Sequence, residues 1–475
     1  MWYIINSNFK QEGNMVFSSL IFIFAYLFVT LAVYYITPVK WRNLVLFAVS
    51  LIFYGWGEPK YILLMLVSII IAYVFGFFIE KYRDKNKRLA KLFLTLSIIG
   101  NLSFLLFFKY YNFFAENIGF ATIPDLKLPV GISFYTFQIM SYSIDLYRKE
   151  VPLAKKFVPF GTYVTLFPQL IAGPIVRYKD VCDQLEHRKE SVSKFASGVT
   201  RFVAGLSKKL ILGDAAAALA KSLETASDFS PTVINAWLIM IFYTFHIYFD
   251  FSGYSDMAIG LGRMFGFEFV ENFNYPYVAK SVTDFWRRWH ITLSTWFREY
   301  IYIPLGGNRV GRLRGFINLA AVWFLTGFWH GADWNYIIWG VYFWFFLVIE
   351  KAFFGKLLSK SPLFGHVYSL LIIGFGWMIF FNTDISNIID IARHLVGYKT
   401  VFFDSGSIHF LLKTLPFIAV CVFGCTPYPK MILNRAKERF AAVGNLIPIF
   451  TFLAFVLCVA YMVDSSFSPF LYYIF

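Results

Sequence analysis

Three of the seven histidines stand in apolar, aromatic segments where an imidazole could carry chemistry: His246, His290 and His330. The other four lie in or beside polar loops and are expected to be ordinary polar residues: His187, His366, His394 and His409. An imidazole has an ordinary pKa of about 6.5, so it can take a proton from a hydroxyl group near neutral pH. The search for an active site therefore begins with the first three.

His330 lies in the sequence TGFWHG at 326–331, directly after an uncharged run. Gly327 and Gly331 flank it, and glycine at these positions would let a substrate or a neighbouring backbone come close. A buried ionisable group in an apolar segment is a candidate for a functional site. The alternative interpretation is a core histidine that donates a hydrogen bond to a backbone carbonyl.

His290 lies in a basic segment that also contains Arg287, Arg288 and Arg298. On a helix, Arg287 and His290 would share a face, with Ser294 one turn further on. Guanidinium groups suit phosphate geometry, so the cluster is a candidate site for a phosphorylated donor such as coenzyme A. The alternative is an interfacial helix whose arginines contact lipid phosphates.

Asp250 and Asp256 follow His246 in the segment 243–256. His246 with Asp250 is only a pair, too few ligands for zinc, so no metal site is predicted. Together with His246, the two aspartates could form a proton or ion relay, which would make the chain a non-enzymatic transporter. A loose glycine motif at 260–266 departs from the dinucleotide fingerprint, and there is no Walker or serine-hydrolase motif.

The composition indicates a polytopic membrane protein. Of 475 residues, 58% are hydrophobic and 15% are charged, against about half and a quarter in soluble proteins. The net charge of +15 is interpreted as basic loops that orient membrane spans, and nucleic acid is not expected as a partner. The fold class predicted is all-α, with the chain embedded in a lipid bilayer.

A membrane-spanning helix needs about 20 mostly apolar residues, and eleven runs qualify, with a twelfth crossing expected near 197–220. The eleven runs are 16–36, 43–56, 61–79, 92–108, 128–144, 232–249, 316–332, 334–349, 367–381, 414–423 and 446–463. The basic loops between them are predicted to be cytoplasmic. Three runs precede the basic loop 81–91, which places the N-terminus outside.

The interior is predicted to be irregular. The run 157–176 contains several prolines and glycines between two basic loops, so it is expected to enter and leave on the same face. Residues 197–220 include Arg201, Lys209 and Asp214, which a lipid-facing helix would tolerate poorly. We expect one membrane domain over 1–475, with a polar tail at 1–14, a catalytic core region at 128–350 and C-terminal helices at 351–475.

Several long motifs resemble the membrane-bound O-acyltransferase superfamily, in its bacterial branch of alginate and peptidoglycan O-acetyltransferases. They are QLIAGPIVR at 169–177, DFSGYSDMAIG at 250–260, WRRWH at 286–290, LSTWFREYIYIPLGGNR at 293–309 and TGFWHG at 326–331. The resemblance covers nearly the whole chain. One departure is Phe328, where many relatives have leucine.

The resemblance implies that His330 is the essential histidine and His290 the second conserved polar position, where some eukaryotic relatives carry asparagine or aspartate. It also implies helices enclosing a central tunnel in a bacterial inner membrane. A cytoplasmic acetyl-CoA would supply an acetyl group, without a tightly bound cofactor, to a polysaccharide hydroxyl or to an extracytoplasmic transfer protein. His330 would act as a general base or form an acyl-histidine.

Supporting roles near the donor are expected for Arg287, Arg288, Arg298, Trp329, Asp250 and Asp256. Two alternatives stay open. One is D-alanyl transfer to teichoic acid from a carrier protein, as in more distant relatives of this branch. The other is the ion- or proton-coupled transporter described above.

Overall fold

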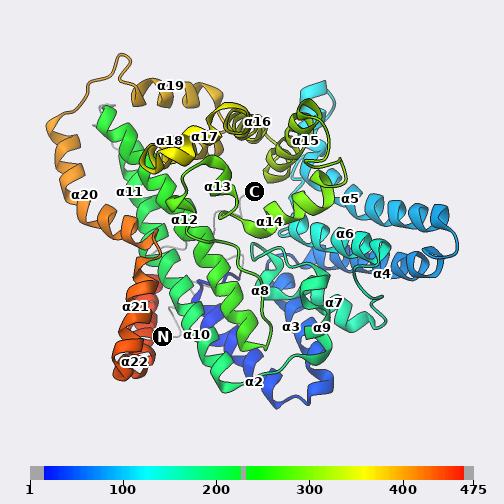
Figure 1. Ribbon diagram of the computed structural model, residues 1–475. Coiled ribbons are helices and arrows are strands. Elements are labelled where there is room, and N and C mark those ends of the chain that lie inside the picture. The colour runs from blue at the N-terminus through cyan, green and yellow to red at the C-terminus, as the bar shows by residue number, and fades with distance from the viewer. Residues whose placement is uncertain (1–14, 226–231, 465–475) are drawn as a thin grey trace. The chain divides into compact units, whose positions relative to one another are not determined.

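The computed structural model describes residues 15–225 and 232–464, and its regular structure within these ranges is helical apart from one isolated bridge (Figure 1). The described residues divide into two compact units. The first holds residues 15–206, 254–270 and 459–464, and the second holds 207–225, 232–253 and 271–458. The all-α prediction is confirmed, the polar tail at 1–14 lies outside the described residues, and the single domain stays a prediction.

The helices of the first unit, in chain order, are η1 (Phe22–Leu27), α2 (Phe28–Ile36), η2 (Val39–Trp41), α3 (Arg42–Gly57), η3 (Pro59–Tyr61), α4 (Ile62–Tyr82), α5 (Lys87–Ile118), α6 (Ile132–Arg148), α7 (Phe157–Thr165), α8 (Phe167–Leu170), α9 (Tyr178–His187) and α10 (Val192–Ser207). The chain then passes to the second unit. Its helices are η4 (Lys208–Gly213), α11 (Asp214–Thr225), α12 (Val233–Met264), η5 (Pro276–Val278), α13 (Val282–Trp286), α14 (Ile291–Phe297), η6 (Arg298–Tyr302), α15 (Arg312–His330), α16 (Trp334–Ile349), η7 (Glu350–Phe354), α17 (Gly355–Lys360), α18 (Pro362–Phe381), α19 (Ile385–Leu395), α20 (Ser405–Gly424), α21 (Tyr428–Arg439) and α22 (Ala441–Asp464). The ends of α12 and α22 return to the first unit.

Within the described part of the chain, seven helices are long and apolar enough to cross a membrane. They are Pro59–Tyr82, Lys87–Ile118, Val233–Met264, Trp334–Lys360, Pro362–Phe381, Ser405–Gly424 and Ala442–Asp464. Each coincides with one of the eleven predicted spans. The other four predictions fall on helices that are shorter or more polar, at η1 with α2, and at α3, α6 and α15.

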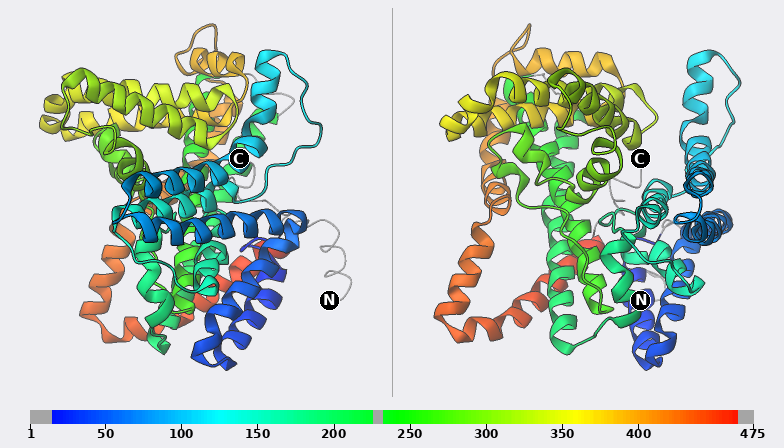
Figure 2. Two further views of the ribbon diagram at one scale, coloured as in Figure 1. Left: turned by 90° about the vertical axis from the view of Figure 1, so that its right-hand side faces the viewer. Right: turned by 45° about the vertical axis from the view of Figure 1, so that its right-hand side comes forward.

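In the first unit, α4 and α5 lie side by side in both views of Figure 2, as two antiparallel helices joined by a short turn. Asn86 starts α5, since its side-chain oxygen accepts the backbone N–H groups of Arg88 and Leu89 at 3.1 Å. The predicted irregular run 157–176 is indeed broken. It forms the short helices α7 and α8, which are interrupted at Leu166.

Arg201, Lys209 and Asp214, the charged residues named for 197–220, are held in ion pairs. In the first unit, Arg201 Nε donates to Asp256 Oδ1 at 2.7 Å. In the second, the fully buried Lys209 Nζ contacts both carboxylate oxygens of Asp214, at 2.6 and 2.7 Å. Lys209 belongs to the π-helical segment η4, which continues α10 into α11. A buried charge needs such a partner, so these pairs explain how the segment tolerates its charges.

Helices α15 and α16 pack closely in the second unit (Figure 1). A Cβ atom at Gly327 would lie 2.3 Å from the carbonyl oxygen of Tyr336, and one at Gly340 would lie 2.4 Å from that of Trp323. A Cβ atom at Gly331 would meet the Tyr336 ring. The glycines beside His330 therefore admit a neighbouring backbone and ring, one of the two possibilities expected from the sequence.

We predict that Gly327→Ala destabilises the protein by about 1–3 kcal/mol, because the new methyl group forces the two helices apart. The apparent midpoint of thermal unfolding in detergent should fall accordingly. Gly315→Ala is the matched control, since Gly315 lies on the same helix with nothing within 4 Å of its added Cβ. Equal midpoints for the two variants would contradict the close contact.

Candidate active site

A cavity of about 270 Å³ in the second unit is lined by both His290 and His330. Its wall is formed mainly by α13, α14 and α15, with Leu347 contributed by α16. Arg287, Ser294 and Arg298 also line it. Residues that are forty positions apart in the sequence thus line one cavity, as the assignment of both histidines to one site requires.

His330 is the last residue of α15 and is 6% exposed. Its ring centroid lies 5.0 Å from that of Trp329, 5.1 Å from that of Trp339 and 5.2 Å from that of Phe380. Trp339 comes from α16, so the close packing at Gly327 also sets one wall around the imidazole. An imidazole in such a dry, aromatic setting can exchange a proton with a bound substrate and is shielded from bulk water.

His290 lies at a break between two helices. Its φ of 44° and ψ of 54° are left-handed, a conformation that is uncommon for residues other than glycine. Helix α13 ends at Trp286 and α14 begins at Ile291, so the prediction that Arg287 and His290 share a face of one helix is wrong. The break nevertheless brings Arg287, His290 and Ser294 to the same cavity.

Burial lowers the pKa of His290 to about 3. The side chain is 1% exposed, and a charged imidazolium would lose its hydration there. His290 is consequently neutral at physiological pH. Its Nδ1 lies 3.2 Å from Oδ1 of Asn272, and its ring packs against Phe251 at a centroid distance of 4.8 Å.

The predicted supporting residues separate into two groups. Arg287 and Arg298 line the cavity with exposed side chains, and the Trp329 ring contacts both imidazoles, at 5.0 Å from His330 and 6.3 Å from His290. Arg288 does not line the cavity. Its Nε donates instead to Asp284 Oδ1 at 2.9 Å. Arg288 was expected near the donor, but it is not among the residues that line this cavity.

The two predicted aspartates stand in structural ion pairs. Asp250 lies 3.8 Å from Lys209 Nζ and is not among the residues that line the cavity, and Asp256 belongs to the first unit with Arg201. His246 Nδ1 lies 3.0 Å from the carbonyl oxygen of Gly213. Within the described ranges, no three His, Cys, Asp or Glu side chains are grouped as a metal site.

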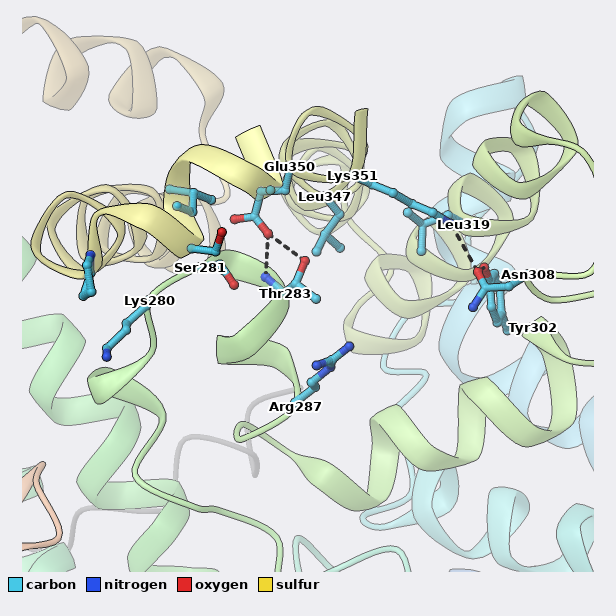
Figure 3. Close-up of a pocket in the computed structure, with 14 residues that line it drawn as sticks. Lys280, Ser281, Thr283, Arg287, Tyr302, Asn308, Leu319, Leu347, Glu350 and Lys351 are labelled. Carbon is cyan, nitrogen blue, oxygen red and sulfur yellow. Dashed lines mark hydrogen bonds between the residues drawn. The ribbon is translucent and has the colours of Figure 1, made fainter. Parts of the chain in front are cut away.

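A second cavity of about 690 Å³ shares the lining residues Thr283, Arg287, Tyr302, Leu319 and Leu347 with the histidine cavity (Figure 3). Three cationic side chains line it: Lys280, Arg287 and Lys351. Lys280, Lys351 and Asn308 were not identified from the sequence. Basic residues are common in the loops of this chain, and only the fold shows which of them meet.

Glu350 lines the larger cavity and is hydrogen-bonded to Thr283, which lines both cavities. It is 4% exposed, and its carboxylate accepts the backbone N–H group of Val282 at 2.6 Å. It also accepts the backbone N–H group of Thr283 at 2.9 Å and the Thr283 hydroxyl at 2.6 Å (Figure 3). It thereby caps the N-terminus of α13, where a carboxylate is favourable. In the sequence, Glu350 is marked only as a charged residue at the end of the apolar run 334–349.

The next residue, Lys351, donates from Nζ to Asn308 Oδ1 at 3.2 Å, and the Tyr302 hydroxyl donates to the same atom at 2.8 Å. Both Glu350 and Lys351 belong to the π-helical segment η7, a type of segment often found at functional sites. This segment therefore holds two walls of the larger cavity, α13 and the loop around Asn308.

We predict that Glu350→Ala lowers stability by about 2–3 kcal/mol, because three hydrogen bonds to a buried carboxylate are lost. Glu350→Gln keeps one acceptor oxygen and should lose less. Thermal unfolding in detergent measures both, with Glu438→Gln on an exposed face of α21 as the control. A Glu350→Ala midpoint equal to that of the control would show that the cap contributes nothing.

The chain matches the description "MBOAT, membrane-bound O-acyltransferase family" over residues 154–387. It is 38% identical to the "Probable alginate O-acetylase AlgI" of Azotobacter vinelandii, over 97% of this chain and 100% of that protein. It is 34% identical to the peptidoglycan O-acetyltransferase of Helicobacter pylori, over 82% and 81%. A more distant relative is the teichoic acid D-alanyltransferase of Bacillus subtilis, 30% identical over 45% and 56%.

The apolar helices, the two histidines in one cavity and these similarities define the class of protein, an integral multi-pass membrane enzyme that transfers acyl groups. The chain belongs to the membrane-bound O-acyltransferase family.

Proposed function

We propose that this enzyme transfers an acetyl group from cytoplasmic acetyl-CoA to a hydroxyl on the other side of a bacterial inner membrane. The acceptor is an alginate-like cell-surface polysaccharide, or an extracytoplasmic protein that relays the group to it. The observation that carries the proposal is the pair of histidines in one cavity, whose wall continues into a larger cavity lined by cations. The names of the relatives supply the acetyl group and the polymer.

In the proposed reaction, the acceptor hydroxyl oxygen attacks the carbonyl carbon of the thioester while His330 takes the hydroxyl proton. The C–O bond forms and the C–S bond breaks. The leaving thiolate then receives the proton from His330, so the products are an acetyl ester and a free thiol. His290 and Arg287 orient the donor, and Trp329 holds the two imidazoles beside each other.

The larger cavity supports coenzyme A as the donor. Its size suits a nucleotide-bearing thioester better than an acetyl group alone, and Lys280, Arg287 and Lys351 supply positive charge for phosphates. By the positive-inside rule, the basic segment 263–314 lies on the cytoplasmic side and the N-terminus outside. The thioester would then enter from the compartment in which it is made.

D-alanyl transfer from a carrier protein is the second candidate, since the Bacillus subtilis relative is named for it. The shorter alignment with that relative makes it the weaker proposal. The transporter alternative loses its basis, because Asp250 and Asp256 are engaged by Lys209 and Arg201 and the family is one of enzymes.

We predict that His330→Ala abolishes acetylation and that His290→Asn lowers its rate by about 10²–10⁴-fold, as expected for a lost acid–base or orienting group. Mass spectrometry of envelope glycans from cells with each variant measures the product. His366→Ala serves as the control. His366 is a partly buried histidine that does not line the cavity, and its Nδ1 lies 3.1 Å from the carbonyl oxygen of Ala279. Wild-type acetylation by His330→Ala would contradict the proposal.

For the donor, we predict that the double variant Lys280→Gln/Lys351→Gln raises KM for acetyl-CoA about tenfold with a smaller change in kcat, because charge-assisted contacts to phosphate are lost. Lys356→Gln is the control, because Lys356 is exposed nearby on α17 and does not line the cavity. Thiol release by purified enzyme measures both constants. An unchanged KM would exclude this cavity as the phosphate site.

A further inference from the structure

Asn272 is a fully buried residue in the connection between α12 and η5, and no role was expected for it. Its side-chain oxygen Oδ1 lies 2.8 Å from the Thr292 hydroxyl, 3.3 Å from the Thr292 backbone nitrogen and 3.2 Å from His290 Nδ1. One amide oxygen thus lies within hydrogen-bond distance of the imidazole itself and of two groups on Thr292.

These contacts settle the orientation of the amide. A backbone N–H can only donate, so the atom that faces the nitrogen of Thr292 must be the oxygen of Asn272. That oxygen can only accept, so the hydrogen bond with His290 requires the hydrogen to be on Nδ1. In a neutral imidazole only one nitrogen carries hydrogen, which makes Nε2 the basic nitrogen.

The backbone holds the same arrangement. The N–H of Ile291 donates to the carbonyl oxygen of Asn272 at 2.9 Å, and the N–H of Asn274 donates to that of Arg288 at 2.9 Å. The backbone before and after His290 is therefore hydrogen-bonded to the segment 272–274. A left-handed histidine costs conformational energy, and such local strain persists only where its surroundings fix it.

We propose that Asn272 is a positioning residue that fixes His290 as the Nδ1–H tautomer, so that Nε2 is a permanent hydrogen-bond acceptor at the cavity. The neutral state follows from burial, and the imidazole packs edge-to-face with Phe251 and Trp329, at centroid distances of 4.8 and 6.3 Å. The other titratable or charged groups that line this cavity are Arg287, Arg298, Tyr302 and His330. A bare Nε2 accepts a hydrogen bond, so His290 can recognise an O–H or N–H group of a substrate.

The tautomer can be measured without any substrate. Solid-state NMR of enzyme labelled with ¹⁵N-histidine distinguishes protonated from bare ring nitrogens, and His290→Asn identifies the signal among the seven histidines. We expect protonated Nδ1 and bare Nε2 at pH 7. A protonated Nε2 with a bare Nδ1 would overturn the proposal, whatever the enzyme's reaction proves to be.

The kinetic consequence rests on the proposed acyl transfer and is tested with Asn272→Asp. The carboxylate keeps an acceptor for all three donors but stabilises the imidazolium, which raises the pKa of His290. We expect the pH at which His290 takes up a second proton, followed by its ¹⁵N signals, to move up by one unit or more. The value of kcat/KM for acetyl-CoA should fall with that protonation and approach the wild-type value at high pH.

Asn235→Asp is the matched control, because Asn235 is also a buried asparagine of the second unit and does not line the cavity. Its pH profile should follow that of the wild type. A purely structural Asn272 predicts a uniform loss of activity without a shift. A wild-type pH profile for folded Asn272→Asp, or a uniform loss, would therefore overturn the positioning role.

Discussion

The close approach of α15 and α16 is the contact on which the site depends. Glycines at positions 327 and 340 remove the side chains that would separate the two backbones, and Gly331 leaves room for the Tyr336 ring. Because α16 lies so near, its Trp339 reaches His330, and its direction carries Glu350 to the N-terminus of α13. Helix α13 in turn leads into Arg287 and His290. The close contact of α15 with α16 thus helps to bring His290 and His330, which are distant in the sequence, to one cavity.

The second constraint is the cost of burying charge in an apolar interior. The pairs of Arg201 with Asp256 and of Lys209 with Asp214 meet that cost. An intramembrane aspartate is a sound indication of function when nothing else is known. Here Asp250 and Asp256 lie in ion pairs with Lys209 and Arg201, while burial keeps His290 neutral.

Sequence reasoning succeeded where one physical rule dominates. Bilayer thickness fixes the length of apolar runs, so seven predicted spans coincide with long helices. The broken run 157–176 was predictable because proline and glycine interrupt helices. Motif resemblance located His290 and His330, and the structure places both at one cavity.

The failures concern tertiary contacts. A regular helix through Arg287, His290 and Ser294 was the natural extrapolation from spacing, but the hydrogen bonds of Asn272 stabilise a break that spacing cannot reveal. Arg287 and Arg288 are neighbours in sequence and look equivalent, yet the ion pair with Asp284 removes one of them from the cavity wall. Glu350 acts through backbone groups almost seventy residues away, which no local pattern indicates.

The left-handed backbone at position 290 also limits which residues the family can use there. Histidine, asparagine and aspartate enter this conformation several times more readily than other side chains, whereas β-branched residues are strained in it. Asparagine and aspartate belong to that short set. Backbone geometry thus restricts the residue at position 290 of this chain independently of catalysis. A change of chemistry at this site is open only to polar residues that already fit the turn.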